Sequence, residues 1–230
     1  MGQFPKADDD TVIPMDLINS AIDRDVTLAA SEPILWGLDV ARFGGDNSAL
    51  CIRQGNTVLE ITTFNSMDLM QLCGAIKNRY DDSTVMERPQ EILVDVIGLG
   101  SGVVDRLAEQ NLPVRGVNVA EAPSTKKNYL NLRAELWFAI KDWLAQRDCR
   151  LPNNDELASE LAAPQYKYTS SGKIKIESKD EMRKRGIKSP DKADALALTM
   201  ASSAASFGGS QAFMGYNFKK PLKSRIFRVG

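Results

Sequence analysis

The sequence of 230 residues contains no histidine. This absence excludes Ser-His-Asp and Cys-His catalysis, histidine metal ligands and an imidazole pH switch. Acid–base or metal chemistry must therefore use carboxylates, lysines or thiols. The three cysteines, Cys51, Cys73 and Cys149, are scattered and have no CxxC spacing. Their pattern disfavours a zinc site and a disulfide framework, and it is typical of a reducing compartment.

The sequence also lacks a strong net charge and long hydrophobic runs, which excludes several classes of protein. The chain has little net charge, −1 from 29 Lys+Arg and 30 Asp+Glu, unlike proteins that coat nucleic acid through bulk charge. It has no apolar signal region at its N-terminus, and its longest weakly polar stretch, residues 193–207, contains Asp194. We therefore expect a soluble, cytoplasmic protein without a membrane span. The hydrophobic content of 43% is sufficient for the core of one domain with short extensions.

Composition divides the chain into three parts. Residues 1–30 carry six aspartates against one lysine and one arginine, and include a short helical pattern at residues 15–22. We interpret them as a linker or arm outside the core. Residues 31–206 hold the regular apolar patterns of a folded domain. Residues 207–230 contain five basic residues and no acid, which indicates a flexible tail or a segment that docks to a partner or to nucleic acid.

The patterns of the central part predict an α/β fold. β-rich runs at 34–40, 48–53 and 57–64, with a Gly-Asn hairpin signal at 55–56, predict an antiparallel meander. Alternating helical and strand patterns follow, at 66–80, 91–96, 103–110, 114–119, 128–146 and 155–161. A small hairpin at 166–169 and 173–177 precedes a final helix at 189–205. Ser66 and Ser189 are the expected N-caps, with Pro190 at the first position of the last helix. The order predicts a mixed central sheet flanked by helices, with an extra β-hairpin.

Three places carry carboxylates that local structure explains poorly. Asp39 and Asp95 end apolar strands, where an acid is costly to bury unless it is paired or binds a metal. Asp191 and Asp194 share one face of the last helix through their i, i+3 spacing. The simpler alternatives are a turn cap for Asp39, a routine strand–helix turn at Asp95 and favourable N-terminal helix charge for Asp191. Together, these acids indicate oxygen ligands for Mg²⁺ or Mn²⁺, and two such ions suit phosphodiester hydrolysis.

A basic stretch leads directly to these acids. Residues 173–188 hold seven Lys or Arg residues against three acids. An anionic substrate requires positive charge beside the metal site, although Lys/Arg-rich turns are often simply solvated. The candidate DNA-contacting residues are Lys179, Arg183, Lys184, Arg185 and Lys188.

The glycine-rich turn Gly98–Gly102 offers an alternative function. A strand, a GxGxG turn and a helix are half of a dinucleotide-binding fingerprint. That fingerprint requires an acid about 20 residues later, and Glu121 is a poor match. No second mononucleotide-binding half follows it. A nucleotide-binding enzyme therefore stays the less favoured hypothesis.

Four segments in this order resemble the nuclease domain of tailed-phage large terminases. They are Gly37-Leu-Asp-Val-Ala-Arg-Phe-Gly-Gly-Asp-Asn-Ser48, Asp95-Val-Ile-Gly-Leu-Gly-Ser-Gly102, Lys173-Ile-Lys-Ile-Glu-Ser-Lys179 and Ser189-Pro-Asp-Lys-Ala-Asp-Ala-Leu196. The resemblance implies an RNase H-like fold, similar to Holliday-junction resolvases, and a metal-dependent endonuclease that cuts concatemeric viral DNA. Asp39, Asp95 and Asp194 would be the metal ligands and catalytic residues, with Asp191 a further acid at the metal. In the two-metal mechanism, Asp39 would bridge the ions, and Asp95 and Asp194 would each complete one site.

The resemblance also implies partners and a context. The family acts on double-stranded DNA in the host cytoplasm, and the full-length protein works with a portal protein and a small terminase subunit. This sequence has no GxxxxGK[ST] phosphate loop, so the family's ATPase motor is missing. We therefore expect an excised C-terminal domain or gene fragment, in which residues 1–30 correspond to the linker after that motor. A second hypothesis is a non-catalytic docking module that retains the fold.

Overall fold

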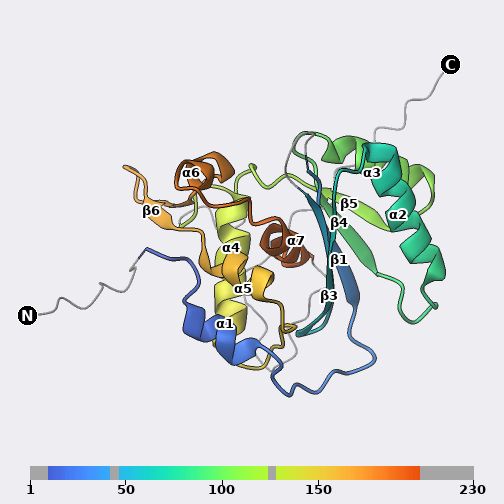
Figure 1. Ribbon diagram of the computed structural model, residues 1–230, viewed down its shortest axis with the longest axis horizontal. Helices are drawn as coiled ribbons and strands as arrows, with labels where there is room; N and C mark the ends of the chain where they lie inside the picture. The colour runs from blue at the N-terminus through green and yellow to red at the C-terminus, as the bar shows by residue number, and fades with distance from the viewer. Residues whose placement is uncertain (1–9, 42–46, 124–127, 203–230) are drawn as a thin grey trace, which may run out of the picture.

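The computed structural model describes residues 10–41, 47–123 and 128–202, and its centre is a mixed five-stranded sheet (Figure 1). The spatial order of its strands is β3-β2-β1-β4-β5. The strands β1 (Ile34–Asp39), β2 (Ser48–Gln54) and β3 (Thr57–Phe64) form an antiparallel meander. The strands β4 (Glu91–Asp95) and β5 (Val114–Val117) extend the sheet in parallel with β1. The predicted mixed sheet is therefore confirmed.

Helices cover both faces of the sheet (Figure 1). α2 (Leu69–Asp82) and α3 (Gly100–Glu109) lie on one face, over a core that includes Trp36 and Val94. The other face carries α1 (Met15–Ala21), α4 (Leu132–Ala145), α5 (Asp155–Ala162) and α7 (Asp191–Thr199). The predicted extra hairpin is the separate two-stranded sheet of β6 (Tyr166–Tyr168) and β7 (Ile174–Ile176), followed by α6 (Lys179–Lys184). None of the described helices has the length and hydrophobicity that a membrane crossing requires.

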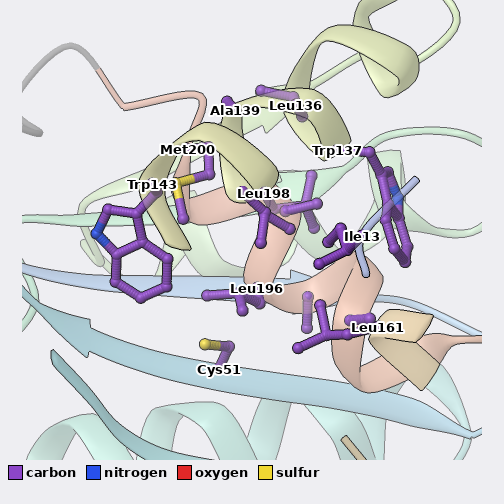
Figure 2. Close-up of a cluster of buried hydrophobic side chains, with 14 of the residues drawn as sticks. Ile13, Cys51, Leu136, Trp137, Ala139, Trp143, Leu161, Leu196, Leu198 and Met200 are labelled. Atoms are coloured by element: carbon purple, nitrogen blue, oxygen red, sulfur yellow. The ribbon is translucent and has the colours of Figure 1, made fainter. Parts of the chain in front are cut away.

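The larger core lies between α4, α7 and the sheet. Figure 2 shows Trp137 and Trp143 of α4 with Leu196, Leu198 and Met200 around the C-terminal half of α7. All nine residues of α7 are buried, including Asp191 and Asp194. A helix that is buried all round is fixed by packing on every side, so its acids are held in defined positions.

Gly37 allows α7 to lie directly on β1. A Cβ atom at Gly37 would be 2.0 Å from the carbonyl oxygen of Ala195 and 2.9 Å from Cγ2 of Thr199. Successive strand residues alternate between faces, so Gly37 and Asp39 point toward the same helix. The close approach at Gly37 therefore brings the carboxylate of Asp39 to the first turn of α7.

The N-terminal segment around α1 packs into the core, contrary to our expectation. We interpreted residues 1–30 as lying outside the core, but Val12, Ile13, Ile18 and Ala21 are completely buried in the larger core. The backbone N–H of Val12 donates to the carbonyl of Pro164 at 3.1 Å. The segment around α1 is thus part of the folded domain. The predicted basic tail, 207–230, lies outside the described residues.

Several element ends also differ from the sequence patterns. α2 begins after Asp68, which forms a capping box with Gln71, and not after Ser66. α7 begins at Asp191 with Pro190 as its N-cap residue, one position later than predicted from Ser189. Helix α6 was not predicted, because five of its six residues are charged and it has no apolar repeat. Its signal is the capping box that Ser178 forms with Glu181.

Candidate active site

Asp39 and Asp95 lie side by side at the carboxyl edge of the sheet. Each is the last residue of its strand. Leu38 pairs with Val94 in the parallel ladder of β1 and β4, so the residues that follow them, Asp39 and Asp95, are neighbours across the two strands. Both point to the face covered by α7, since they alternate with residues packed against α2 and α3. An oxygen of Asp95 also accepts a hydrogen bond from the backbone N–H of Ile97 at 3.1 Å.

The ammonium group of Lys179 lies among three of the acids. Its Nζ is 2.9 Å from Oδ2 of Asp39, 3.2 Å from Oδ1 of Asp191 and 3.4 Å from Oδ2 of Asp194. Lys179 is the first residue of α6 and is 12 residues before Asp191. Carboxylates from β1 and α7 therefore converge on one cationic position, which a lysine fills in this structure.

Burial and charge shift the pKa values of this cluster. Burial raises the pKa of Asp39 to about 7, against the opposing effect of Lys179. Burial also raises the pKa values of Asp95 and Asp191. For Lys179, burial would lower the pKa, but the charges of Asp39, Asp194 and Asp191 outweigh it and raise the value. The acids around Lys179 therefore favour a positive charge at this position.

Asp194 is oriented by two side chains of α4. Its Oδ1 accepts from the indole Nε1–H of Trp137 at 2.9 Å and from Nη2 of Arg133 at 3.1 Å. Burial would raise the pKa of Asp194, but Arg133, Lys179 and the Trp137 hydrogen bond together lower it. Arg133 is itself anchored by a 2.7 Å bond to the carbonyl of Glu177. Asp194 is thus ionised, and its Oδ2 lies between Nη2 of Arg133 at 3.3 Å and Nζ of Lys179 at 3.4 Å.

A cavity of about 430 Å³ opens onto this cluster. Asp39, Asp95 and Asp194 are among the residues that line it, and Leu136 and Leu198 contribute apolar surface. Three cations besides Lys179 also line it: Lys175, Arg133 and Arg183. The cavity lining therefore combines positive charge, which suits an anionic ligand, with carboxylate oxygens, which suit a cation.

The predicted DNA-contacting cations fall into two groups. Lys179 belongs to the acid cluster, and it would have to leave its three ion pairs to contact DNA. Arg183 pairs with Asp180, and Arg185 pairs with Glu177. Lys184 and Lys188 are exposed in the chain segment that leads to α7. The structure thus brings the predicted acids together. Of the predicted cations, Lys179, Arg183 and Arg185 form ion pairs, and Lys184 and Lys188 are exposed.

The carboxylate oxygens of the cluster are suitable ligands for a hard divalent cation, but they lie farther apart than the ligands of a bound ion. In the described part of the chain, no group of three acids is arranged to hold a metal ion. The three oxygens around Nζ of Lys179 lie at 2.9–3.4 Å, whereas Mg²⁺ requires about 2.0–2.1 Å. The chemistry of the donors fits, because all are carboxylate oxygens and already surround one positive charge. A metal would require displacement of Lys179 and a small inward movement of the carboxylates.

Comparison with solved structures identifies the fold. No protein-family model matches the sequence, and no curated protein does either. The nuclease domain of the large terminase subunit gp2 of bacterial virus Sf6 is similar with a TM-score of 0.68 and 20% identity, over 82% of this chain and 97% of that one. The fold is that of a terminase nuclease domain.

Two further structures support the terminase nuclease fold. The large terminase nuclease of thermophilic phage G20c, solved with bound magnesium, matches with a TM-score of 0.63 and 14% identity over 85% of this chain and 99% of that one. The nuclease domain of Thermus phage P74-26 matches with a TM-score of 0.61 and 13% identity over 89% and 98%. The RNase H-like fold expected from the sequence is therefore confirmed.

The glycines of the β4–α3 turn serve packing in this fold. A Cβ atom at Gly100 would lie 1.7 Å from the carbonyl oxygen of Asp95, and one at Gly102 would lie 2.9 Å from Leu69. Gly98 adopts a positive φ of 77°. Gly100 thus lets the start of α3 lie against the end of β4 beside Asp95, and Gly102 lets it lie against Leu69 at the start of α2. They need no bound nucleotide to explain them.

Sequence reasoning missed Arg133 and Trp137. Both contact Asp194 from a helix about 60 residues earlier in the chain. Nothing in their local pattern distinguishes them, because Trp137 has the spacing of an ordinary core residue and Arg133 that of a solvated one. Only the tertiary fold brings them to the site.

Proposed function

We propose that this chain is the metal-dependent endonuclease domain of a phage DNA-packaging terminase. It would cut concatemeric viral DNA by hydrolysing phosphodiester bonds in the cytoplasm of the host cell. The observation that carries the proposal is the convergence of Asp39, Asp191 and Asp194 on one cationic position beside Asp95. This convergence occurs in the fold of terminase nuclease domains.

Asp39, Asp95 and Asp194 would hold one or two Mg²⁺ or Mn²⁺ ions, with Asp191 at the same site. When bound, such ions activate water and stabilise the charge that develops on a scissile phosphate. The chain supplies the orientation: Trp137 and Arg133 fix Asp194, and the register of β1 and β4 fixes Asp39 beside Asp95. Lys179 compensates the charge of Asp39, Asp191 and Asp194, and it would have to leave this position for a metal to be held there.

DNA would approach across α6 and the segment that follows it. Lys184 and Lys188 are exposed there, and Arg183 lines the cavity. Such contacts to phosphates are independent of sequence and weaken with added salt. In the complete packaging machine, a portal protein and a small terminase subunit would be further partners.

One observation favours a second candidate, a non-catalytic docking module. Lys179 forms ion pairs with three of the acids, as in a purely structural ion-pair network. In that case the acids would stabilise the fold, and added metal would not bind. The two candidates therefore differ in metal binding before any DNA is present.

The decisive experiment is nicking of supercoiled plasmid with Mn²⁺ or Mg²⁺, paired with calorimetric titration of Mn²⁺ alone. We expect cleavage by the wild-type chain and its loss, by at least about 100-fold, in Asp39→Asn and Asp194→Asn. Asp105→Asn, at an exposed position on α3, is the matched control and should cut normally. Undiminished cleavage in Asp194→Asn would overturn the site assignment. Absence of both Mn²⁺ binding and cleavage would favour the docking module.

A further inference from the structure

Helix α7 starts without a capping side chain of its own. Its N-cap residue is Pro190, whose side chain makes no capping hydrogen bond. The backbone N–H of Asp194 is already bonded within the helix, to the carbonyl of Pro190 at 2.8 Å. The earlier N–H groups of the first turn need acceptors from outside, since an α-helix leaves them without intrahelical partners. This is the turn that carries the two acids of the candidate site.

Glu160 of α5 supplies that acceptor. Its Oε2 accepts a hydrogen bond from the backbone N–H of Ala193 at 3.0 Å, and it also interacts with the N–H of Lys192. The two N–H groups belong to the residues between Asp191 and Asp194. A carboxylate at this position satisfies two free donors and complements the positive end of the helix dipole.

The opposite end of α7 is held by an arginine. Nε of Arg53 donates to Oγ1 of Thr199 at 2.9 Å, and its Nη2 donates to the Thr199 carbonyl at 2.9 Å. Arg53 is completely buried on β2, so this attachment is rigid. The helix is thus fixed by an acid at its N-terminus and by a base at its C-terminus, each from a different element.

We propose that Glu160 is a positioning residue for the acid pair of α7. It acts through the backbone of Lys192 and Ala193, and it sets where Asp191 and Asp194 stand relative to Asp39 on β1. The inference rests on the proposed function for its consequence in metal binding, but its structural part can be tested without metal. Because Arg53 and the packed apolar face of α7 remain, loss of Glu160 should release the first turn while the helix stays docked.

The indole group of Trp137 reports on the position of Asp194. Its Nε1–H donates to Oδ1 of Asp194, so its resonance in an ¹⁵N–¹H spectrum depends on where that carboxylate lies. The chain has three tryptophans, which Trp→Phe variants assign individually. Amide hydrogen exchange at Lys192 and Ala193 reports on the cap itself.

The test compares Glu160→Ala, Glu160→Gln and Asp155→Asn in the full chain. Asp155→Asn is the matched control, because Asp155 is exposed at the start of the same helix and its replacement leaves Glu156 paired with the buried Lys192 ammonium group. In Glu160→Ala we expect a shifted Trp137 indole resonance and about five- to tenfold faster exchange at Ala193, the loss expected for a helix cap. Glu160→Gln retains an oxygen acceptor and should stay close to wild type in both measurements, as should Asp155→Asn.

Metal titration adds the functional consequence. We expect the Kd for Mn²⁺ to rise about tenfold in Glu160→Ala and less than about threefold in Glu160→Gln, in the range seen when groups that orient metal ligands are removed. If wild type binds no Mn²⁺, the proposed function fails. The Trp137 resonance and the Ala193 exchange rate then still test whether Glu160 positions the first turn of α7. An unchanged Trp137 resonance and unchanged Ala193 exchange in folded Glu160→Ala protein would overturn the inference. If Glu160→Ala does not fold, Glu160→Asp, whose shorter side chain cannot reach Ala193, takes its place in the comparison.

Discussion

Lys179 determines the charge of the candidate site at the scale of a single residue. It is about one-third exposed, and it offsets three carboxylates that are nearly buried. Removing one partner of such a network leaves uncompensated charge, which costs far more than the net value of the intact pairs. The same removal frees the cationic position for a metal ion.

We therefore predict opposite effects of Lys179→Met without and with metal. In a chelating buffer, the variant should lose about 3 kcal/mol of stability in urea unfolding. Mn²⁺ should then raise its melting temperature more than that of wild type, because a ligand selective for the folded state stabilises it. Lys184→Met, an exposed position on the same helix, should behave as wild type. Equal Mn²⁺ shifts in all three proteins would show that Lys179 does not occupy the metal position.

Glu160 should make stability depend on pH. Burial, together with the charges of Asp191 and Glu156, raises its pKa to about 7, although the N–H groups of Ala193 and Lys192 lower it. A carboxyl group whose pKa is higher in the folded than in the unfolded chain stabilises the protein below its unfolded pKa, and that contribution is lost as the pH rises. Wild type should therefore lose stability relative to Glu160→Gln between about pH 4.5 and 7. Urea unfolding of both proteins across this range measures it, and parallel curves would contradict the shift.

Close backbone packing controls the site at the scale of elements. Gly37 permits α7 to lie on β1, and a methyl group there would meet the Ala195 carbonyl at 2.0 Å. Neither backbone can move freely, since β1 is the middle strand of the sheet and α7 is buried all round. The separation between Asp39 and the acids of α7 thus depends on the absence of one side chain.

Gly37→Ala and Gly74→Ala should have opposite effects. The first should destabilise the chain by about 3 kcal/mol, because overpacking forces backbone shifts. Gly74 lies within α2, and nothing is within 4 Å of a Cβ atom there. Its replacement should stabilise the chain by about 0.5–1 kcal/mol, since alanine favours the helix. Urea unfolding of both variants checks the signs, and a neutral Gly37→Ala would show that α7 adjusts its distance from β1.

The elements differ in how far local sequence determines them. The sheet was predictable because its strands carry apolar runs and the β2–β3 connection has a Gly-Asn turn, all within a few residues. Helix α6 was not, because its stability comes from a capping box and ion pairs and not from an apolar face. Asp39 and Asp95 stood out as carboxylates at apolar strand ends, and Asp191 and Asp194 as an i, i+3 pair at the start of a helix. Arg133, Trp137 and Glu160 did not, because their partners lie 30 to 60 residues away and only the packing of α4 and α5 on α7 brings them together.

At the scale of the whole molecule, the near-neutral charge divides into unlike regions. The candidate acids Asp39, Asp95 and Asp194 gather at the cavity, and the segment from Lys173 to Lys188 beside it is basic. The net charge of −1 therefore describes the average of the chain and not the surface beside the site. Local charge, not the total, governs how an anionic polymer approaches.

The N-terminal segment gives the last prediction, because it decides where the domain begins. A fragment that starts at residue 31, the boundary expected from composition, lacks the completely buried Val12, Ile13 and Ile18 and exposes the apolar surface of α4 and α5 that they cover. Each such side chain contributes about 1.5–3 kcal/mol of burial. Their combined loss is comparable with the whole stability of a domain, about 5–15 kcal/mol. We expect this fragment to lose cooperative unfolding in urea and to aggregate.

A fragment that starts at residue 10 keeps every contact described above and should unfold cooperatively, with a midpoint close to that of the full chain. Equal midpoints for the two fragments would mean that the α1 segment is dispensable and that the domain does begin near residue 31.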